Sequence, residues 1–190
     1  MPSHDNATVV LIPIRSFDDS KSRLAEALDP TERRRLTMWM AARVVSAAGA
    51  LPVRVVTDDH DVVEWAHEVG VGAMRVDRKG LNASVTAAVD HAARVGFERA
   101  IIAHADLPAA EDLSVVDKPG VSIAPDTARD GSNVMCIPAA SGFVFAYGPA
   151  SFSRHCDEAR RLDLPLTIVD DPSLAWDVDD PSDLPPDWNH

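Results

Sequence analysis

Four short apolar runs, each followed by a turn signal, place the strongest constraint on the fold of this chain. They cover residues 9–13, 51–57, 73–76 and 100–105, and the segments between them have the length and apolar spacing of helices. Strands that alternate with helices form mostly parallel sheets, and right-handed crossovers bring the strand ends to one edge. We therefore predict an α/β fold with a mostly parallel, doubly wound sheet.

The second half of the chain departs from this alternation. We expect a short helix over residues 111–116, strands over 121–124, 133–137 and 142–145, a helix over 151–161 and a last strand over 166–169. This pattern predicts a mixed, strand-rich insertion that covers one side of a pocket. The length of 190 residues fits one domain, residues 1–190.

Composition excludes several classes of protein. The formal net charge of -12 argues against a general nucleic-acid binder, because such proteins need a basic face. Cys136 and Cys156 form neither a disulfide framework nor a zinc motif, which favours a reducing, cytoplasmic location. No run approaches the roughly 18 apolar residues of a membrane helix. We expect a soluble cytoplasmic protein without nucleic-acid or membrane partners.

Residues 100–108, AIIAHADLP, carry the first candidate functional residue. Apolar residues lead to Asp106, and Pro108 prevents the strand from continuing. At the carboxyl end of a parallel strand, a carboxylate can hold a metal ion against an anionic substrate. Asp106 can equally cap the turn that follows, and position alone does not decide between these roles. His104 is interpreted as a packed core histidine.

The loop after the first strand, RSFDDSKSRL, contains the cations Arg15, Lys21 and Arg23. A nucleoside triphosphate needs such groups near its phosphate oxygens, although a solvated basic loop has the same composition. The phosphate motif GxxxxGK[ST] is absent, and no GxGxxG follows a strand, so P-loop and Rossmann dehydrogenase proteins are excluded. Neither GxSxG nor HExxH occurs, so no hydrolase motif competes.

Three further segments can take part in binding. Asp177 and Asp179, in the terminal DVDDPSDL, can join Asp106 around Mg²⁺, which prefers hard oxygen ligands. The segments DGSN at 130–133 and YGPAS at 147–151 offer hydroxyl and N–H donors to an anion, or form a turn and a helix cap. The segment GLN at 80–82 either contacts a base or forms a turn in which Asn82 caps the next helix.

Taken together, these segments resemble the guanylyltransferases that make the activated phospho-acid precursor of coenzyme F-420. The matching stretches, in the family's order and across nearly the whole chain, are IPIRSFDDSKSRL, RKGLN, HADLP, APDTARDGSN, FAYGPASFSRH and DVDDPSDL. HADLP occurs in many nucleotidyltransferases, whereas YGPxSFxRH combined with KSRL is much more specific. The resemblance implies a single-domain nucleotidyltransferase fold of the GT-A type.

The resemblance also implies roles for the matching residues. Asp106 and Asp179 would hold Mg²⁺, with Asp177 as an alternative terminal ligand, and Lys21, Arg23 and Asp106 would be catalytic. Other expected contacts are Arg15, Lys21 and Arg23 with the triphosphate, Gly80, Leu81 and Asn82 with the nucleoside, and Ser132, Gly148 and Ser151 with the phospho-acid. Two residues depart from the family: Ser132 replaces the usual Thr, and Asp180 replaces the usual Thr of the terminal motif.

The implied reaction is attack by the phosphate of phosphoenolpyruvate or 2-phospho-L-lactate on the α-phosphorus of GTP, which releases pyrophosphate. The sequence does not separate these acceptors from 3-phosphoglycerate. One alternative is a related transferase acting on a molybdopterin or a sugar phosphate, but such enzymes usually have glycines in the first loop, and RSFDDSKSRL has none. An inactive GTP-binding regulatory module is another alternative. The sequence leaves open whether the chain forms a homodimer.

Overall fold

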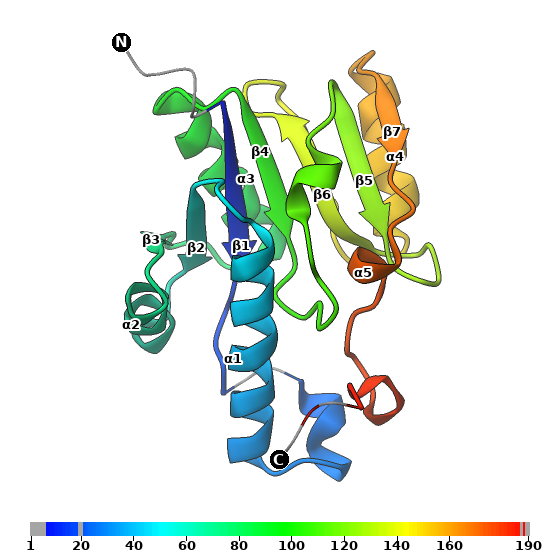
Figure 1. The fold of residues 1–190 in the computed structure, drawn as a ribbon. Coiled ribbons are helices and arrows are strands. Elements are labelled where there is room, and N and C mark those ends of the chain that lie inside the picture. Colours follow the sequence, from blue (N-terminus) through cyan, green and yellow to red (C-terminus); the bar gives the residue numbers. More distant parts are fainter. Residues whose placement is uncertain (1–6, 19–20, 187, 189–190) are drawn as a thin grey trace.

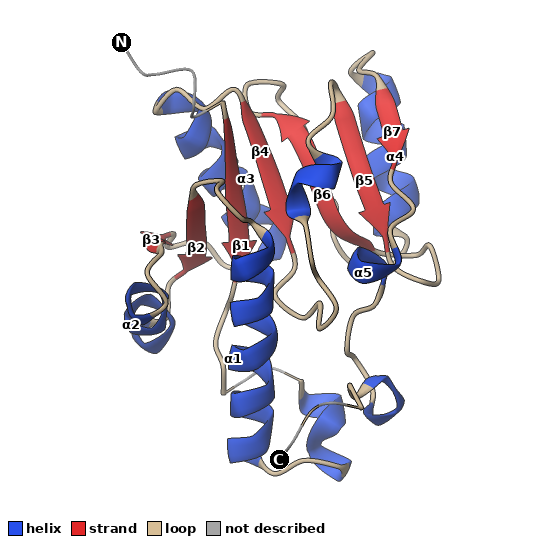
Figure 2. Cartoon of the chain, viewed as in Figure 1, coloured by secondary structure: helices blue, strands red, loops and turns tan. Residues whose placement is uncertain are grey.

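The computed structural model describes residues 7–18, 21–186 and 188, which form one seven-stranded sheet with helices on both faces (Figures 1 and 2). The strand order is β3-β2-β1-β4-β6-β5-β7. The strands are β1 (Thr8–Pro13), β2 (Val53–Thr57), β3 (Gly72–Arg75), β4 (Arg99–Ala103), β5 (Val121–Pro125), β6 (Ser132–Pro138) and β7 (Leu166–Ile168). Only β6 runs antiparallel to its neighbours. The predicted α/β fold with a mostly parallel sheet is confirmed.

Strand alternation divides the core into two layers. Val10 and Ile12 of β1 face one layer, whereas Val9 and Leu11 face the other. The first layer is covered by α1 (Pro30–Ala47), α2 (His60–Glu68), α5 (Pro172–Ala175) and the 3-10 helix η3 (Leu113–Val116). The second is covered by α3 (Leu81–Arg94) and α4 (Ser151–Arg161), which lie behind the sheet in Figure 1. The sheet is therefore doubly wound, as predicted.

Helix α1 begins with a capping box formed by Asp29 and Glu32. The Asp29 side chain accepts from the backbone N–H of Glu32 at 2.9 Å, and the Glu32 carboxylate accepts from the N–H of Asp29 at 2.7 Å. This capping box satisfies donors that the first helical turn leaves unpaired. The helix extends beyond the carboxyl edge of the sheet, where it contacts η2 (Ser22–Glu26), which in turn contacts η4 (Pro181–Asp183) (Figure 1). None of the described helices is long and apolar enough to span a membrane.

The strand predicted over residues 142–145 is wrong. Phe143 and Phe145 are buried while Val144 is 60% exposed, so the alternation is real, but the segment pairs with no strand. Instead, one side chain of α4 binds its backbone: Glu158 accepts from the N–H of Val144 at 2.9 Å. Because β6 already lies between β4 and β5, this segment has no open strand beside it.

Two helix predictions also need correction. The helix that follows Gly80 begins at Leu81, and Gly80 itself is its N-cap, with a φ of 89° that suits glycine. Asn82 therefore lies inside the helix and does not cap it. Residues 111–116 form only the short η3, which begins at Leu113.

Candidate active site

A cavity of about 490 Å³ opens at the edge of the sheet where the parallel strands end. Since β6 is antiparallel, its first residues reach the same edge. The cavity is lined by Pro13, Ile14, Arg15, Ser16, Lys21, Thr37, Leu81, His104, Ala105, Asp106, Asp126, Asp130, Gly131, Asn133, Tyr147, Gly148, Ser151, Asp177 and Asp179. Segments from both ends of the chain thus meet at the place where open α/β sheets bind ligands.

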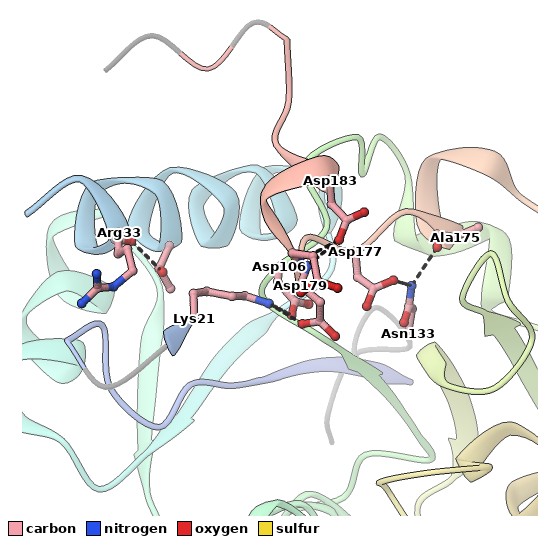
Figure 3. Close-up of polar contacts among 10 residues, drawn as sticks. Lys21, Arg33, Asp106, Asn133, Ala175, Asp177, Asp179 and Asp183 are labelled. Atoms are coloured by element: carbon pink, nitrogen blue, oxygen red, sulfur yellow. Dashed lines mark hydrogen bonds and ion pairs between the residues drawn. The ribbon is translucent and has the colours of Figure 1, made fainter. Parts of the chain in front are cut away.

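Lys21 lies between two carboxylates of this cavity. Its Nζ is 2.6 Å from Oδ2 of Asp106 and 3.1 Å from Oδ1 of Asp179 (Figure 3). The Lys21 side chain is only 10% exposed. Asp106 follows β4, Asp179 precedes η4, and Lys21 immediately precedes η2, so three separate segments provide this cluster.

Charge pairing outweighs burial in this cluster. Burial alone would raise the pKa of Asp106, but the charges of Lys21 and then of His104 hold it below its ordinary value. Burial would lower the pKa of Lys21, but Asp106 and, to a smaller extent, Asp179 raise it above its ordinary value. Both partners are therefore ionised at neutral pH.

Asp177 provides a third carboxylate beside the pair. Burial, and then the negative charge of Asp106, raise the pKa of Asp177 above its ordinary value. Oδ1 of Asp106 is buried and has no hydrogen-bond partner within the described part of the chain. A buried carboxylate oxygen without a partner is costly, so the cluster fits a further cation. The only described acid or histidine triad with all ligand atoms within 4.8 Å is the exposed set His60, Asp61 and Glu64, away from this cavity.

The predicted phospho-acid residues meet around the start of α4. Gly148 and Ser151 line the cavity, and Oγ of Ser151 accepts from the backbone N–H of Ser132 at 3.2 Å. Nε2 of His155 accepts from the N–H of Ala146 at 2.9 Å, so the proton lies on Nδ1, which donates to Oγ of Ser132 at 3.0 Å. Ser132 is buried behind the cavity wall, where it connects β6 to α4.

A second cavity, of about 690 Å³, adjoins the first and shares Arg15 and Leu81 with it. Gly80 also lines this second cavity, as do Arg78 and Lys79 of the RKGLN segment, which the residue predictions missed. These two cations directly precede Gly80 in the sequence, and that position was the signal for them. The two cavities together can accommodate the two ends of an extended ligand.

Asn82 and Arg23 lie outside both cavities. The Asn82 carboxamide holds the backbone of Tyr147: Oδ1 accepts from its N–H at 2.7 Å, and Nδ2 donates to its carbonyl at 3.4 Å. Arg23 lies exposed on η2. Asn82 thus supports the wall formed by residues 147–151. Arg15 and Lys21 line the first cavity, whereas Arg23 does not.

Several side chains of the first cavity were not among the predicted contacts, and His104, Asn133 and Tyr147 are three of them. The His104 and Tyr147 rings lie 5.2 Å apart, and their atoms Nε2 and Oη are both buried without a hydrogen-bond partner among the described residues. The view of His104 as a packed core residue therefore needs correction, since it also lines the cavity. The sequence signal for His104 as a cavity residue was its position two residues before Asp106.

Comparisons with known proteins identify relatives of this chain and structures with the same fold. A family model described as "Guanylyl transferase CofC like" matches residues 8–186. A phosphoenolpyruvate guanylyltransferase of Rubrobacter xylanophilus is 34% identical, with 92% of this chain and 90% of that protein covered. A 2-phospho-L-lactate guanylyltransferase of Methanothermobacter thermautotrophicus is 31% identical, with 93% and 82% covered. A solved structure of 4-diphosphocytidyl-2C-methyl-D-erythritol synthase from Anaerococcus prevotii has the same fold, with a TM-score of 0.64 and 10% identity over 94% of this chain and 95% of that one.

Proposed function

Because the chain belongs to the guanylyl transferase CofC-like family, as its sequence motifs predicted, we propose that it transfers GMP from GTP to a small phosphorylated carboxylic acid. The acceptor is phosphoenolpyruvate or 2-phospho-L-lactate, the compounds for which its relatives are named. Pyrophosphate is the second product, and the guanylylated acid is a precursor of coenzyme F-420. The chain is accordingly a nucleotidyltransferase that binds a nucleotide and a phosphorylated substrate.

The cluster of Lys21, Asp106 and Asp179 on the wall of the first cavity supports this proposal most directly. Transfer of a nucleotidyl group needs positive charge against the phosphates, together with acids that bind a divalent cation. Arg15 lies at the junction of the two cavities, where it can contact the triphosphate. Arg78, Lys79 and Gly80 line the second cavity, which we assign to the nucleoside.

We include Mg²⁺ in the proposal because the acids fit it. Asp106 and Asp179 would hold the ion, with Asp177 as the alternative or additional carboxylate. The unpartnered Oδ1 of Asp106 supports this choice, since Mg²⁺ binds hard oxygen ligands. When bound, Mg²⁺ would neutralise charge on the phosphates and orient them.

The residues of this chain would act by positioning and by charge. An oxygen of the acceptor phosphate attacks the α-phosphorus of GTP, the bond to the bridging oxygen breaks, and pyrophosphate leaves with that oxygen. The acceptor phosphate is already ionised at neutral pH, so no general base is required. Lys21 would contact the triphosphate, while Gly148 and Ser151 would hold the acceptor in line. Arg23 would join the triphosphate contacts only after movement of η2.

The test is a parallel assay of phosphoenolpyruvate, 2-phospho-L-lactate and 3-phosphoglycerate with GTP and Mg²⁺. Pyrophosphate release is measured and the product is identified by mass. We expect release with one of the first two acceptors. GTP binding without release for any acceptor would contradict the proposal and favour the inactive regulatory module.

The variant Asp106→Asn tests the acid cluster in the same assay. The amide removes the negative charge that faces Lys21 and the metal, so we expect pyrophosphate release to fall at least about 100-fold. The circular dichroism spectrum should stay that of the wild type, since the amide is nearly isosteric. Turnover close to that of the wild type would contradict the assignment of Asp106 as a catalytic metal ligand.

A further inference from the structure

Asn133 lies in the second position of β6, where it faces away from the acceptor side of the cavity. Its neighbour Ser132 contacts His155 and Ser151 of α4, whereas the Asn133 side chain contacts the segment that leads to Asp177. We infer that Asn133 is a positioning residue, which holds the Asp177 carboxylate and the adjoining segment against Asp106. The inference rests on the proposed function, because it takes these acids as the metal site.

The carboxamide of Asn133 makes three contacts with one short segment. Nδ2 donates to the carbonyl of Leu174 at 3.1 Å. It also donates to the carbonyl of Ala175 at 3.2 Å and to Oδ1 of Asp177 at 3.4 Å (Figure 3). Asn133 is only 2% exposed. A buried amide that contacts both the backbone and a carboxylate restrains where that carboxylate points.

The backbone of Asn133 also reaches the other half of the acid cluster. Its carbonyl accepts from the N–H of His104 at 2.9 Å, two residues before Asp106. The carbonyl of Asp106 in turn accepts from the N–H of Val178 at 3.2 Å, between Asp177 and Asp179. Asn133 is therefore hydrogen-bonded both to the segment after β4 and to the C-terminal segment whose acids must converge.

The surrounding contacts separate this role from a general structural one. Thr127 also binds the carbonyl of Ala175, through its N–H at 3.0 Å and its hydroxyl at 3.1 Å. At the far end, the Asp183 carboxylate accepts from the N–H groups of Asp179 and Asp180. Loss of the Asn133 side chain therefore leaves the segment anchored, but removes the donor that contacts the Asp177 carboxylate. Groups that orient metal ligands typically contribute 10- to 100-fold in metal affinity.

The test uses Mn²⁺ alone as the probe, without nucleotide or acceptor, and follows free Mn²⁺ by electron paramagnetic resonance. We expect Asn133→Ala to weaken binding at least about 10-fold, with a melting temperature only a few degrees lower. The matched control is Asn82→Ala, which also loses two side-chain bonds to backbone but holds residue 147 instead. Its Mn²⁺ affinity should stay within about twofold of the wild type.

The inference is overturned if Asn133→Ala binds Mn²⁺ as the wild type does while Asp106→Asn does not. If Asp106→Asn also binds like the wild type, the metal site of the proposed function fails instead. If Asn133→Ala does not fold, an NMR titration of the wild-type protein labelled with ¹⁵N-asparagine tests the inference instead. The side-chain amide resonance of Asn133 should shift as Mg²⁺ saturates the site, and an unmoved resonance overturns the inference.

Discussion

At the scale of single residues, the conformation of Lys21 is the unusual feature of the cavity. Its φ of 57° lies in the left-handed region, which costs a side-chain-bearing residue about 1 kcal/mol or more. Contacts with Asp106 and Asp179 offset that cost. The ammonium group thus stays beside the carboxylates that we propose as metal ligands, ready to contact phosphates.

We predict that Lys21→Met lowers pyrophosphate release at least about 100-fold, because the cation meant for the phosphates is gone. The same variant should bind Mn²⁺ more tightly than the wild type in the absence of nucleotide, since the ammonium no longer competes for Asp106 and Asp179. Steady-state assays and Mn²⁺ titration check the two expectations. Lys118→Met, which removes an exposed lysine outside both cavities, is the matched control and should behave as wild type.

At the scale of elements, His155 joins α4 to two other parts of the acceptor side. It is fully buried, accepts from the N–H of Ala146 and donates to Ser132 of β6. Burial lowers its pKa to about 4, and the positive charge of Arg154 acts in the same direction. The helix therefore packs against the sheet through a neutral imidazole, which protonation would disrupt.

A pH dependence of stability follows from that lowered pKa. Between about pH 6.5 and pH 4, the unfolded state binds a proton at His155 that the folded state does not, so the free energy of unfolding falls as pH falls. From pH 7 to 4.5 we expect His155 to account for on the order of 2 kcal/mol of that loss. In His155→Gln this part of the pH dependence should be absent, measured by urea unfolding at both pH values. Equal losses for variant and wild type would refute this.

At the scale of the whole molecule, a small separate core positions the catalytic segments. Leu24 of η2, Leu36 and Met40 of α1 and Val178 of the C-terminal segment pack together below the sheet edge. Leu24 lies three residues after Lys21, and Val178 lies directly between Asp177 and Asp179. This core therefore holds the cation and the terminal acids in one place, although they come from opposite ends of the chain.

Shortening a side chain of that core should lower activity more than an equally destabilising change elsewhere in the protein. Val178→Ala is expected to cost about 2 kcal/mol of unfolding free energy and to reduce kcat at least about tenfold, because Asp177 and Asp179 lose their support. Val121→Ala removes an equally buried side chain from the start of β5, at the opposite edge of the sheet. Urea unfolding and steady-state kinetics of both variants test this, and equal losses of kcat would contradict it.

Local patterns predicted most of the fold because their physical causes are local. The apolar runs and the turn signals that follow them depend on neighbours a few residues away. The prediction of a strand around Phe143 and Phe145 failed because a strand depends on distant residues. The alternation of this segment is typical of a strand, but a strand also needs a partner, and the place of β6 in the sheet leaves none.

Taken by itself, the sequence determined the family and the alternation of strands and helices. It also determined which acidic and basic side chains are available for nucleotidyl transfer. Only the tertiary structure decided how those residues meet. It brings Lys21 to Asp106 and Asp179, 85 and 158 residues along the chain, leaves Arg23 outside the cavities and turns Asn82 into a support for the wall. Side-chain convergence over such separations depends on how whole elements pack, which no local hydrogen-bond or hydrophobic pattern contains.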